Sequence, residues 1–186
     1  MIKSLYTTFQ HWSEKGSVFI ISDTHFDDCD RDYMGYTITS QDQADIITNT
    51  IHKFDTLIHL GDVGNPEYLK DIKGYKVLIL GNHDFSATKF KPYFDEIYEG
   101  PLIVGKKLIL SHEPLDTAWA FNIHGHDHNP ANSGDDFHLN LAANVCGYQP
   151  QNLGKLIKGG LLKNILDIHR ITIDNAAERK GLKMNL

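Results

Sequence analysis

The sequence predicts an α/β fold, and three of its features support this prediction. Short apolar runs rich in β-branched residues recur along the first two thirds of the chain, as expected for buried strands. Helix signals lie between several of these runs, and strands that alternate with helices are typical of α/β domains. Each run also leads into a cluster of polar residues, and in open α/β sheets such clusters meet at one edge.

Apolar runs define the predicted core strands. They cover residues 18–21, 56–60, 76–80, 107–110 and 121–123. Further strands are predicted over residues 96–98, 102–104 and 137–141. We expect 96–98, 102–104 and 107–110 to be antiparallel, so that the C-terminal third adds a second, more antiparallel sheet.

The clearest helix signal begins at Ser40. This residue is the expected N-cap, with Gln43 in the capping-box position. Apolar side chains then recur at spacings of three and four, which predicts one buried helical face. This face consists of Ala44, Ile47, Ile51 and Phe54. Farther on, Pro66 at a first helical position predicts a short helix over residues 66–72.

The length of 186 residues predicts one domain, residues 1–186. Its last part carries weak helical patterns over residues 160–168 and 176–184, and we expect a polar tail over about 175–186 to fray. The net charge of -6 argues against a nucleic-acid partner or an anionic membrane surface, since both select basic proteins. No apolar run approaches about 20 residues, and the first residues do not resemble a signal peptide, so we expect a cytoplasmic protein without a membrane partner.

Cysteine content narrows the class of protein further. Cys29 and Cys146 lie far apart and form no C-x-x-C pair. This pattern excludes a disulfide scaffold and a zinc site built from cysteines, and it fits free thiols in a reducing compartment.

The polar clusters contain side chains that bind metal ions well. These candidates are Asp23, His25, Asp62, Asn82, His112, His126 and His128. Asp23 and His25 are two residues apart, as are His126 and His128, and on an extended chain both side chains of such a pair point the same way. We therefore expect all these side chains to converge on one site.

The number and type of these candidates suit two metal ions. A catalytic zinc takes three protein ligands, so seven candidates fit two ions that share one bridging carboxylate. Oxygen and nitrogen ligands without thiolate favour manganese, iron, zinc or similar ions. Two ions about 3.5–4 Å apart are a common device for displacement at phosphorus.

Taken in order, the clusters resemble the signature of the calcineurin-like metallophosphoesterases. That signature is D-x-H, G-D, G-N-H-[DE], a single His and G-H-x-H. Here it corresponds to 23–25, 61–62, 81–84, His112 and 125–128, so the resemblance covers residues 18–128. It implies the metallo-dependent phosphatase fold, a two-sheet β-sandwich flanked by helices in four αββα layers.

The resemblance also implies a role for each candidate ligand. Asp23, His25 and His128 would hold the first ion. Asn82, His112 and His126 would hold the second ion. Asp62 would bridge the two, which would be divalent manganese, iron, zinc, nickel or cobalt. The nucleophile would be a hydroxide that bridges both ions.

Two further residues resemble the family's catalytic pair. His83 would protonate the leaving oxygen or stabilise charge on the phosphoryl group. Asp84 would orient the His83 imidazole and stabilise its charge.

Departures from the family pattern bear on the substrate. The protein phosphatase branch continues its second block as G-D-x-x-D-R-G, whereas residues 61–67 here read GDVGNPE without the arginine. The acidic loop after His25 contains Asp27, Asp28 and Asp30, which would repel a polyanion. We therefore expect a small phosphoester substrate, preferably a phosphodiester or a nucleotide-like molecule.

The sequence is also compatible with other functions. The protein could be a phosphomonoesterase or protein phosphatase, a nuclease, or a metal-binding scaffold of the same fold without activity. The sequence also leaves the oligomeric state open.

Several other polar and aromatic residues lie near the motifs, and most of them are expected to have structural roles. Strand parity makes His59 a core or helix-facing residue, and His124 is expected to have a structural role. Arg31 would pair with the neighbouring aspartates or reach a phosphate. The tyrosines are expected to pack within the fold, with Tyr33 or Tyr36 as alternative candidates for stacking on a nucleobase.

Overall fold

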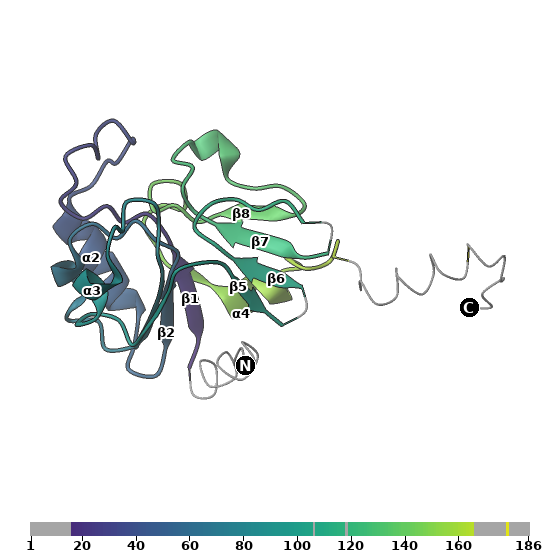
Figure 1. Cartoon of the computed structure of the whole chain (residues 1–186), viewed down its shortest axis with the longest axis horizontal. Helices are drawn as coiled ribbons and strands as arrows, with labels where there is room; N and C mark the ends of the chain where they lie inside the picture. Colours follow the sequence, from purple (N-terminus) through teal and green to yellow (C-terminus); the bar gives the residue numbers. More distant parts are fainter. Residues whose placement is uncertain (1–15, 106, 118, 166–177, 179–186) are drawn as a thin grey trace.

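The computed structural model describes residues 16–105, 107–117, 119–165 and 178. They form two mixed β-sheets with flanking helices, which confirms the predicted α/β class (Figure 1). In Figure 1 the helices α2 and α3 lie on one side of strands β1 and β2, and the strands β5 to β8 lie on the other side. No helix of the described ranges is long and apolar enough to span a bilayer.

The first sheet has the strand order β4-β3-β2-β1-β9. Its strands are β1 (Val18–Ile21), β2 (Thr56–His59), β3 (Tyr75–Ile79), β4 (Glu96–Tyr98) and β9 (Gln151–Asn152). Strands β1 to β4 are parallel, and only β9 is antiparallel to its neighbour β1. The prediction that β4 belongs to an antiparallel group was wrong. The connection through α3 (Ala87–Phe90) brings the chain back to the edge where β3 begins, so β4 runs parallel to β3.

The second sheet has the strand order β5-β6-β7-β8. Its strands are β5 (Leu102–Val104), β6 (Leu108–Leu110), β7 (Phe121–His124) and β8 (His138–Asn140). The predicted antiparallel pairing holds for β5 and β6, whereas β6, β7 and β8 are parallel. Long loops after β6 and β7 run back along the sheet and make this parallel order possible.

The crossover between β1 and β2 contains the helix α2 (Ser40–Thr50). Its N-cap is Thr39, one residue before the predicted cap, and the side chains of Thr39 and Asp42 form a capping box. Because the helix ends at Thr50, Phe54 falls outside the buried face and is 61% exposed.

The remaining helices are short. They are η2 (Pro66–Leu69), η3 (Pro130–Asn132) and α4 (Leu153–Lys158), and η2 begins at the predicted proline but is a shorter 3-10 helix. The helix predicted from residue 160 is wrong in its described part, since residues 160–164 form turns after α4 has ended. The predicted helix over 176–184 and the predicted tail over 175–186 lie outside the described residues, apart from position 178.

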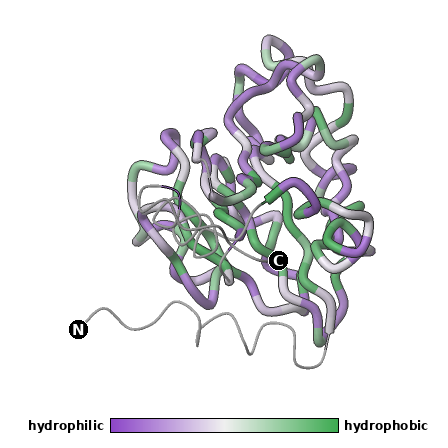
Figure 2. Tube along the Cα trace, turned by 90° about the vertical axis from the view of Figure 1, so that its right-hand side faces the viewer, coloured by the Kyte–Doolittle hydropathy of each residue, from purple (hydrophilic) through white to green (hydrophobic). Residues whose placement is uncertain are grey.

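Alternate residues of the first sheet face two different cores. Ile21 and Leu57 pack toward α2 and η2, while Ile20 and Ile58 pack between the two sheets. Figure 2 shows the corresponding hydrophobic segments inside the trace and hydrophilic loops around them. Because both faces of β1 and β2 are buried, their polar residues are confined to the strand ends.

Candidate metal centre

The predicted ligands follow the carboxyl ends of parallel strands in both sheets. Asp23 and His25 follow β1, and Asp62 follows β2. Asn82 follows β3, His112 follows β6, and His126 and His128 follow β7. The two sheets are joined at this edge by backbone hydrogen bonds from Ser22 N to Leu141 O (2.9 Å) and from Ala143 N to Ser22 O (2.9 Å).

Tight backbone turns, rather than extended strands, present four of these side chains. Asp23, His25, Asp62 and His126 have φ angles of 53°, 42°, 55° and 68°, in the left-handed region. The expectation that each D-x-H or H-x-H pair is extended was therefore wrong. The side chains still converge because each turn follows its strand directly.

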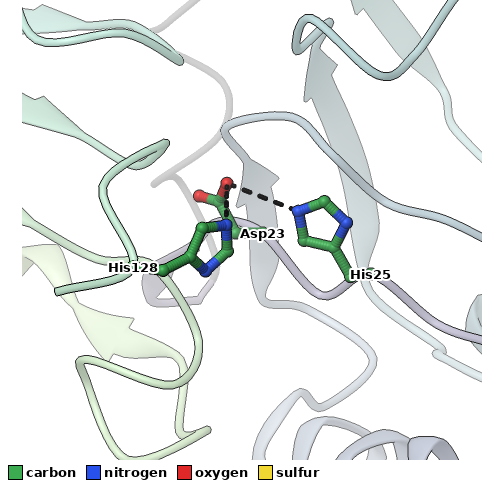
Figure 3. A group of neighbouring side chains, drawn as sticks. All are labelled: Asp23, His25 and His128. Atoms are coloured by element: carbon green, nitrogen blue, oxygen red, sulfur yellow. Dashed lines mark ion pairs between the residues drawn. The ribbon is translucent and has the colours of Figure 1, made fainter. Parts of the chain in front are cut away.

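The first group consists of Asp23, His25 and His128. One carboxylate oxygen of Asp23, Oδ1, lies 3.9 Å from His25 Nε2 and 3.7 Å from His128 Nε2. Figure 3 shows the carboxylate between the two imidazoles, which come from different loops. Asp23 and His25 are buried, whereas His128 is partly exposed.

The second group consists of Asp62, His112 and His126, with Asn82 in contact. Asn82 Oδ1 lies 2.7 Å from His112 Nε2 and 3.0 Å from His126 Nδ1. Asp62 Oδ2 lies 3.4 Å from His112 Nε2 and 3.6 Å from His25 Nε2 of the first group. Asp62 is thus placed between the two groups.

Two unpartnered atoms test whether these residues fit metal ions. Asp23 Oδ1 and His25 Nε2 are buried and have no hydrogen-bond partner in the described part of the chain. Unpaired buried polar atoms are costly, but both are electron-pair donors that face the same space. Two metal–ligand bonds of about 2.0–2.2 Å would bridge separations of this size, so the residues fit a divalent cation.

Glycines of the motifs leave room for the ligand carboxylates. A Cβ atom at Gly81 would collide with Asp62, and one at Gly125 would collide with Asp23 Oδ2 and Ser22 Oγ. The G-N-H-D and G-H-x-H blocks therefore need glycine because a carboxylate from another loop packs against the backbone.

The carboxylates differ in their electrostatic surroundings. Burial raises the pKa of Asp23 above its ordinary value. Burial acts on Asp62 in the same direction, but the hydrogen bond and charge of His112 outweigh it and lower the pKa of Asp62. Burial disfavours the charged form of His112, yet its bond to Asp62 and the charge of Asp23 raise the pKa of His112. The carboxylates of Asp23 and Asp62 thus favour positive charge at this point, which also suits a bound cation.

His83 and Asp84 lie beside these groups in different environments. His83 is exposed, its backbone N donates to Asp62 Oδ1 (2.9 Å), and its ring centroid is 5.5 Å from that of His25. Asp84 is buried and accepts hydrogen bonds from the backbone N of Asp62, Val63 and Gly81. The expected bond between Asp84 and the His83 imidazole is absent among the hydrogen bonds of the described residues.

The histidines assigned structural roles are buried. His59 lies in β2, with Nε2 3.0 Å from Thr24 Oγ1 and Nδ1 accepting from Gly61 N (3.2 Å). His124 Nδ1 lies 2.8 Å from Gly125 O. Both agree with the sequence prediction.

Arg31 differs from expectation, whereas Tyr36 packs inside the fold as expected. The Arg31 guanidinium is buried and donates to the carbonyls of Thr24, His25 and Ile38 instead of pairing with the loop aspartates. Tyr36 is buried against Arg31 and the site imidazoles, which leaves no free ring face for a nucleobase. Tyr33 is 92% exposed.

Two residues that touch the site had no specific role predicted from the sequence. Asp28 Oδ2 lies 3.0 Å from His25 Nδ1, and Asn144 Oδ1 lies 3.1 Å from His128 Nδ1. The spacing of three residues between His25 and Asp28 is a local signal, whereas Asn144 is far from His128 in the sequence. Asp28 also forms an acidic group with Cys29 and Asp30, which are exposed.

Comparisons with known proteins identify the family. The family model of the calcineurin-like phosphoesterase superfamily domain matches residues 17–149. A crystal structure of a protein of unknown function from Aquifex aeolicus has the same fold, with a TM-score of 0.65, 24% identity, and coverage of 77% of this chain and 98% of that chain. No curated protein matches the chain. Since the family model spans strands β1 to β8 and all the clustered ligands, the chain belongs to the calcineurin-like phosphoesterase superfamily.

Proposed function

We propose that the protein is a phosphoesterase that depends on two divalent metal ions and hydrolyses a small phosphodiester. The main support is the pair of buried, unpartnered atoms Asp23 Oδ1 and His25 Nε2, beside a second ligand group that shares Asp62. The domain would comprise residues 1–186. Its two free thiols suit a reducing compartment and support a cytoplasmic location.

The two ligand groups would divide the ions between them. Asp23, His25 and His128 would hold the first ion, with Asp62 shared. Asn82, His112 and His126 would hold the second ion. Divalent ions such as manganese, iron, zinc, nickel or cobalt would polarise the phosphoryl oxygens and lower the pKa of the water that attacks phosphorus.

His83 would act as the general acid. Its backbone is fixed by the bond to Asp62, and its exposed imidazole can reach a substrate above the ligands. In this position it would give a proton to the leaving oxygen. Asp84 would support the reaction indirectly by holding the backbone that carries Asp62.

Charges around the centre favour a substrate with little charge beyond the reacting phosphate. A cavity of about 300 Å³ beside Asn82 and His112 is lined by Glu99 and Glu113. Arg31, the arginine of the neighbouring loop, is occupied by backbone carbonyls. Such surroundings disfavour nucleic acids and polyphosphates and favour a diester with neutral substituents.

The test compares wild type with His83→Asn after loading with Mn²⁺. We expect the wild type to hydrolyse bis(p-nitrophenyl) phosphate faster than p-nitrophenyl phosphate. His83→Asn should lose at least tenfold in kcat on the diester while it still binds two ions by calorimetry.

Other results would select other functions. A faster reaction on the monoester would make the protein a phosphomonoesterase. Metal binding without turnover of either ester, with any of the five metals, would support a binding scaffold. Equal kcat in wild type and His83→Asn would remove His83 from the mechanism.

A further inference from the structure

Three buried or half-buried imidazoles of the centre have partners on the nitrogen that faces away from the ligand groups. His112 Nδ1 lies 2.9 Å from the carbonyl of Leu60, and His128 Nδ1 lies 3.1 Å from Asn144 Oδ1. His25 Nδ1 instead lies 3.0 Å from Asp28 Oδ2. His25 is therefore the imidazole of these three whose outer partner carries a charge.

This contact fixes the tautomer of His25. An ionised carboxylate only accepts hydrogen bonds, so Nδ1 must carry the hydrogen. The lone pair of the neutral ring is then on Nε2, the buried atom that faces Asp23 Oδ1 and Asp62 Oδ2 at 3.9 and 3.6 Å. A lone pair among carboxylate oxygens is stabilised when a cation lies between them.

Asp28 is held in place by its own loop. Its backbone N donates to His25 O (3.1 Å), and its Oδ1 accepts from Asp30 N (3.0 Å). The same loop is fastened farther along, where Asn144 Nδ2 donates to Met34 O (2.9 Å). The carboxylate thus reaches His25 from a fixed backbone and needs little ordering to make its contact.

We propose that Asp28 is a positioning residue of the first metal site. By holding Nδ1–H and adding negative charge to the His25 ring, it makes His25 a stronger ligand, and the first site binds its ion more tightly than the second. A carboxylate behind a ligating histidine acts in this way in metal sites generally, and its loss typically costs 10–100-fold in affinity. The inference rests on the two-ion centre of the proposed function.

The experiment titrates metal-free wild type, Asp28→Ala, Asp28→Asn and Asp30→Asn with Mn²⁺ by calorimetry. Wild type should bind two ions in two separable steps. Asp28→Ala should weaken the tighter step 10–100-fold and change the weaker step less than threefold. Asp28→Asn keeps an acceptor for Nδ1–H but loses the charge, so its tighter step should fall between those of wild type and Asp28→Ala.

Asp30→Asn is the matched control, because it removes the same charge from the same acidic group without touching an imidazole. It should bind both ions as wild type does. With Co²⁺ as probe, the visible absorption of the first equivalent should change in the Asp28 variants alone.

Several results would overturn the inference. Unchanged affinities in Asp28→Ala would do so, as would an equal loss in both steps together with a lower Tm of the metal-free protein. If Asp30→Asn weakened the tighter step as much as Asp28→Asn, the effect would come from the overall charge of the loop and not from the contact with His25. A wild type that binds no metal would contradict the proposed function as well. Two-step binding that the Asp28 substitutions leave unchanged would contradict this inference alone.

Discussion

The Asp84 carboxylate holds the backbone of Asp62. Asp84 Oδ2 accepts a hydrogen bond from Asp62 N at 2.8 Å, and Asp84 Oδ1 accepts one from Val63 N at 3.1 Å. Asp84 Oδ2 also accepts from Gly81 N at 3.0 Å, so one buried side chain joins the loops after β2 and β3. The position of the shared ligand Asp62 therefore depends on Asp84.

The first prediction concerns Asp84→Asn. An amide has one accepting oxygen, so at least one of the three backbone N–H groups would lose its acceptor and face another donor. We expect the metal-free protein to lose about 1–3 kcal/mol in the free energy of unfolding, measured with urea at pH 7.

The control for Asp84 is Asp71→Asn, on the exposed surface, which should change the free energy of unfolding by less than about 0.5 kcal/mol. If Asp84→Asn kept its stability and lost only the pH dependence of kcat, Asp84 would act on His83 as predicted from the sequence.

The second prediction concerns removal of the metal ions. A ligand present at 100 times its Kd stabilises the folded state by about 2.7 kcal/mol for each independent site. For a domain of this size, that gain corresponds to a rise in Tm of roughly 5–11 °C. Scanning fluorimetry with Mn²⁺ and with chelator measures the difference. Asp62→Asn, which replaces the shared carboxylate by a weaker amide ligand, should show less than half of the wild-type rise in Tm. A wild-type Tm that does not change with Mn²⁺ would contradict the two-ion centre.

The third prediction uses a glycine as a probe of packing. In Gly125→Ala the added Cβ would push against Asp23 Oδ2 and Ser22 Oγ, so the first ligand group must shift. We expect a loss of about 1–3 kcal/mol in the free energy of unfolding and weaker binding of the first ion. Gly100→Ala adds the same methyl group where no atom lies within 4 Å, and its unfolding and metal titration should match wild type.

The fourth prediction concerns pH and the buried His59. Thr24 Oγ1 donates its hydrogen to Val63 O, so His59 Nε2–H donates to Thr24, and His59 Nδ1 accepts from Gly61 N. A second proton on Nδ1 would face the Gly61 N–H, and burial lowers the pKa of His59 to about 3.

The sign of the pH effect follows from this depressed pKa. The ordinary pKa of histidine is about 6.5. Between this pH and about pH 3, His59 is protonated in the unfolded chain but stays neutral in the folded chain. The neutral His59 therefore causes no loss of folding free energy above pH 6.5. Below it, the free energy of unfolding falls by up to about 1.4 kcal/mol for each pH unit. In urea unfolding of metal-free protein from pH 7 to 5, His59→Gln should show a shallower loss of stability than wild type. His52→Gln, at an exposed position, should keep the wild-type slope, and equal slopes in wild type and His59→Gln would contradict the prediction.

The sequence predicts those parts of the fold that depend on neighbouring residues, and it fails where contacts between distant segments decide the structure. The strands of the core follow from short apolar runs, and their boundaries lie within one residue of the predicted ones for β1, β2 and β3. Strand direction in the second sheet was not predictable in this way, because it depends on how the loops after β6 and β7 run. The N-cap of α2 was misplaced by one residue since Thr39 and Ser40 are both good caps.

The same distinction applies to the candidate site. The structure brings together the seven predicted ligands because each follows a strand of a sheet whose parallel ends meet. Arg31 was misjudged because its nearest neighbours in the sequence are aspartates, while its guanidinium turns inward to backbone carbonyls. Asn144 carries no sequence signal, since its contact with His128 depends on two loops that meet only in the folded chain.

The left-handed backbone of Asp23, His25, Asp62 and His126 has a consequence for evolution and engineering. Such a conformation costs a residue with a side chain about 1–2 kcal/mol, a cost that glycine avoids. A library selected for thermal stability without metal would therefore enrich glycine at these positions and lose the centre. Selection in the presence of metal would retain aspartate and histidine, so the supply of metal during selection decides whether these four positions are conserved.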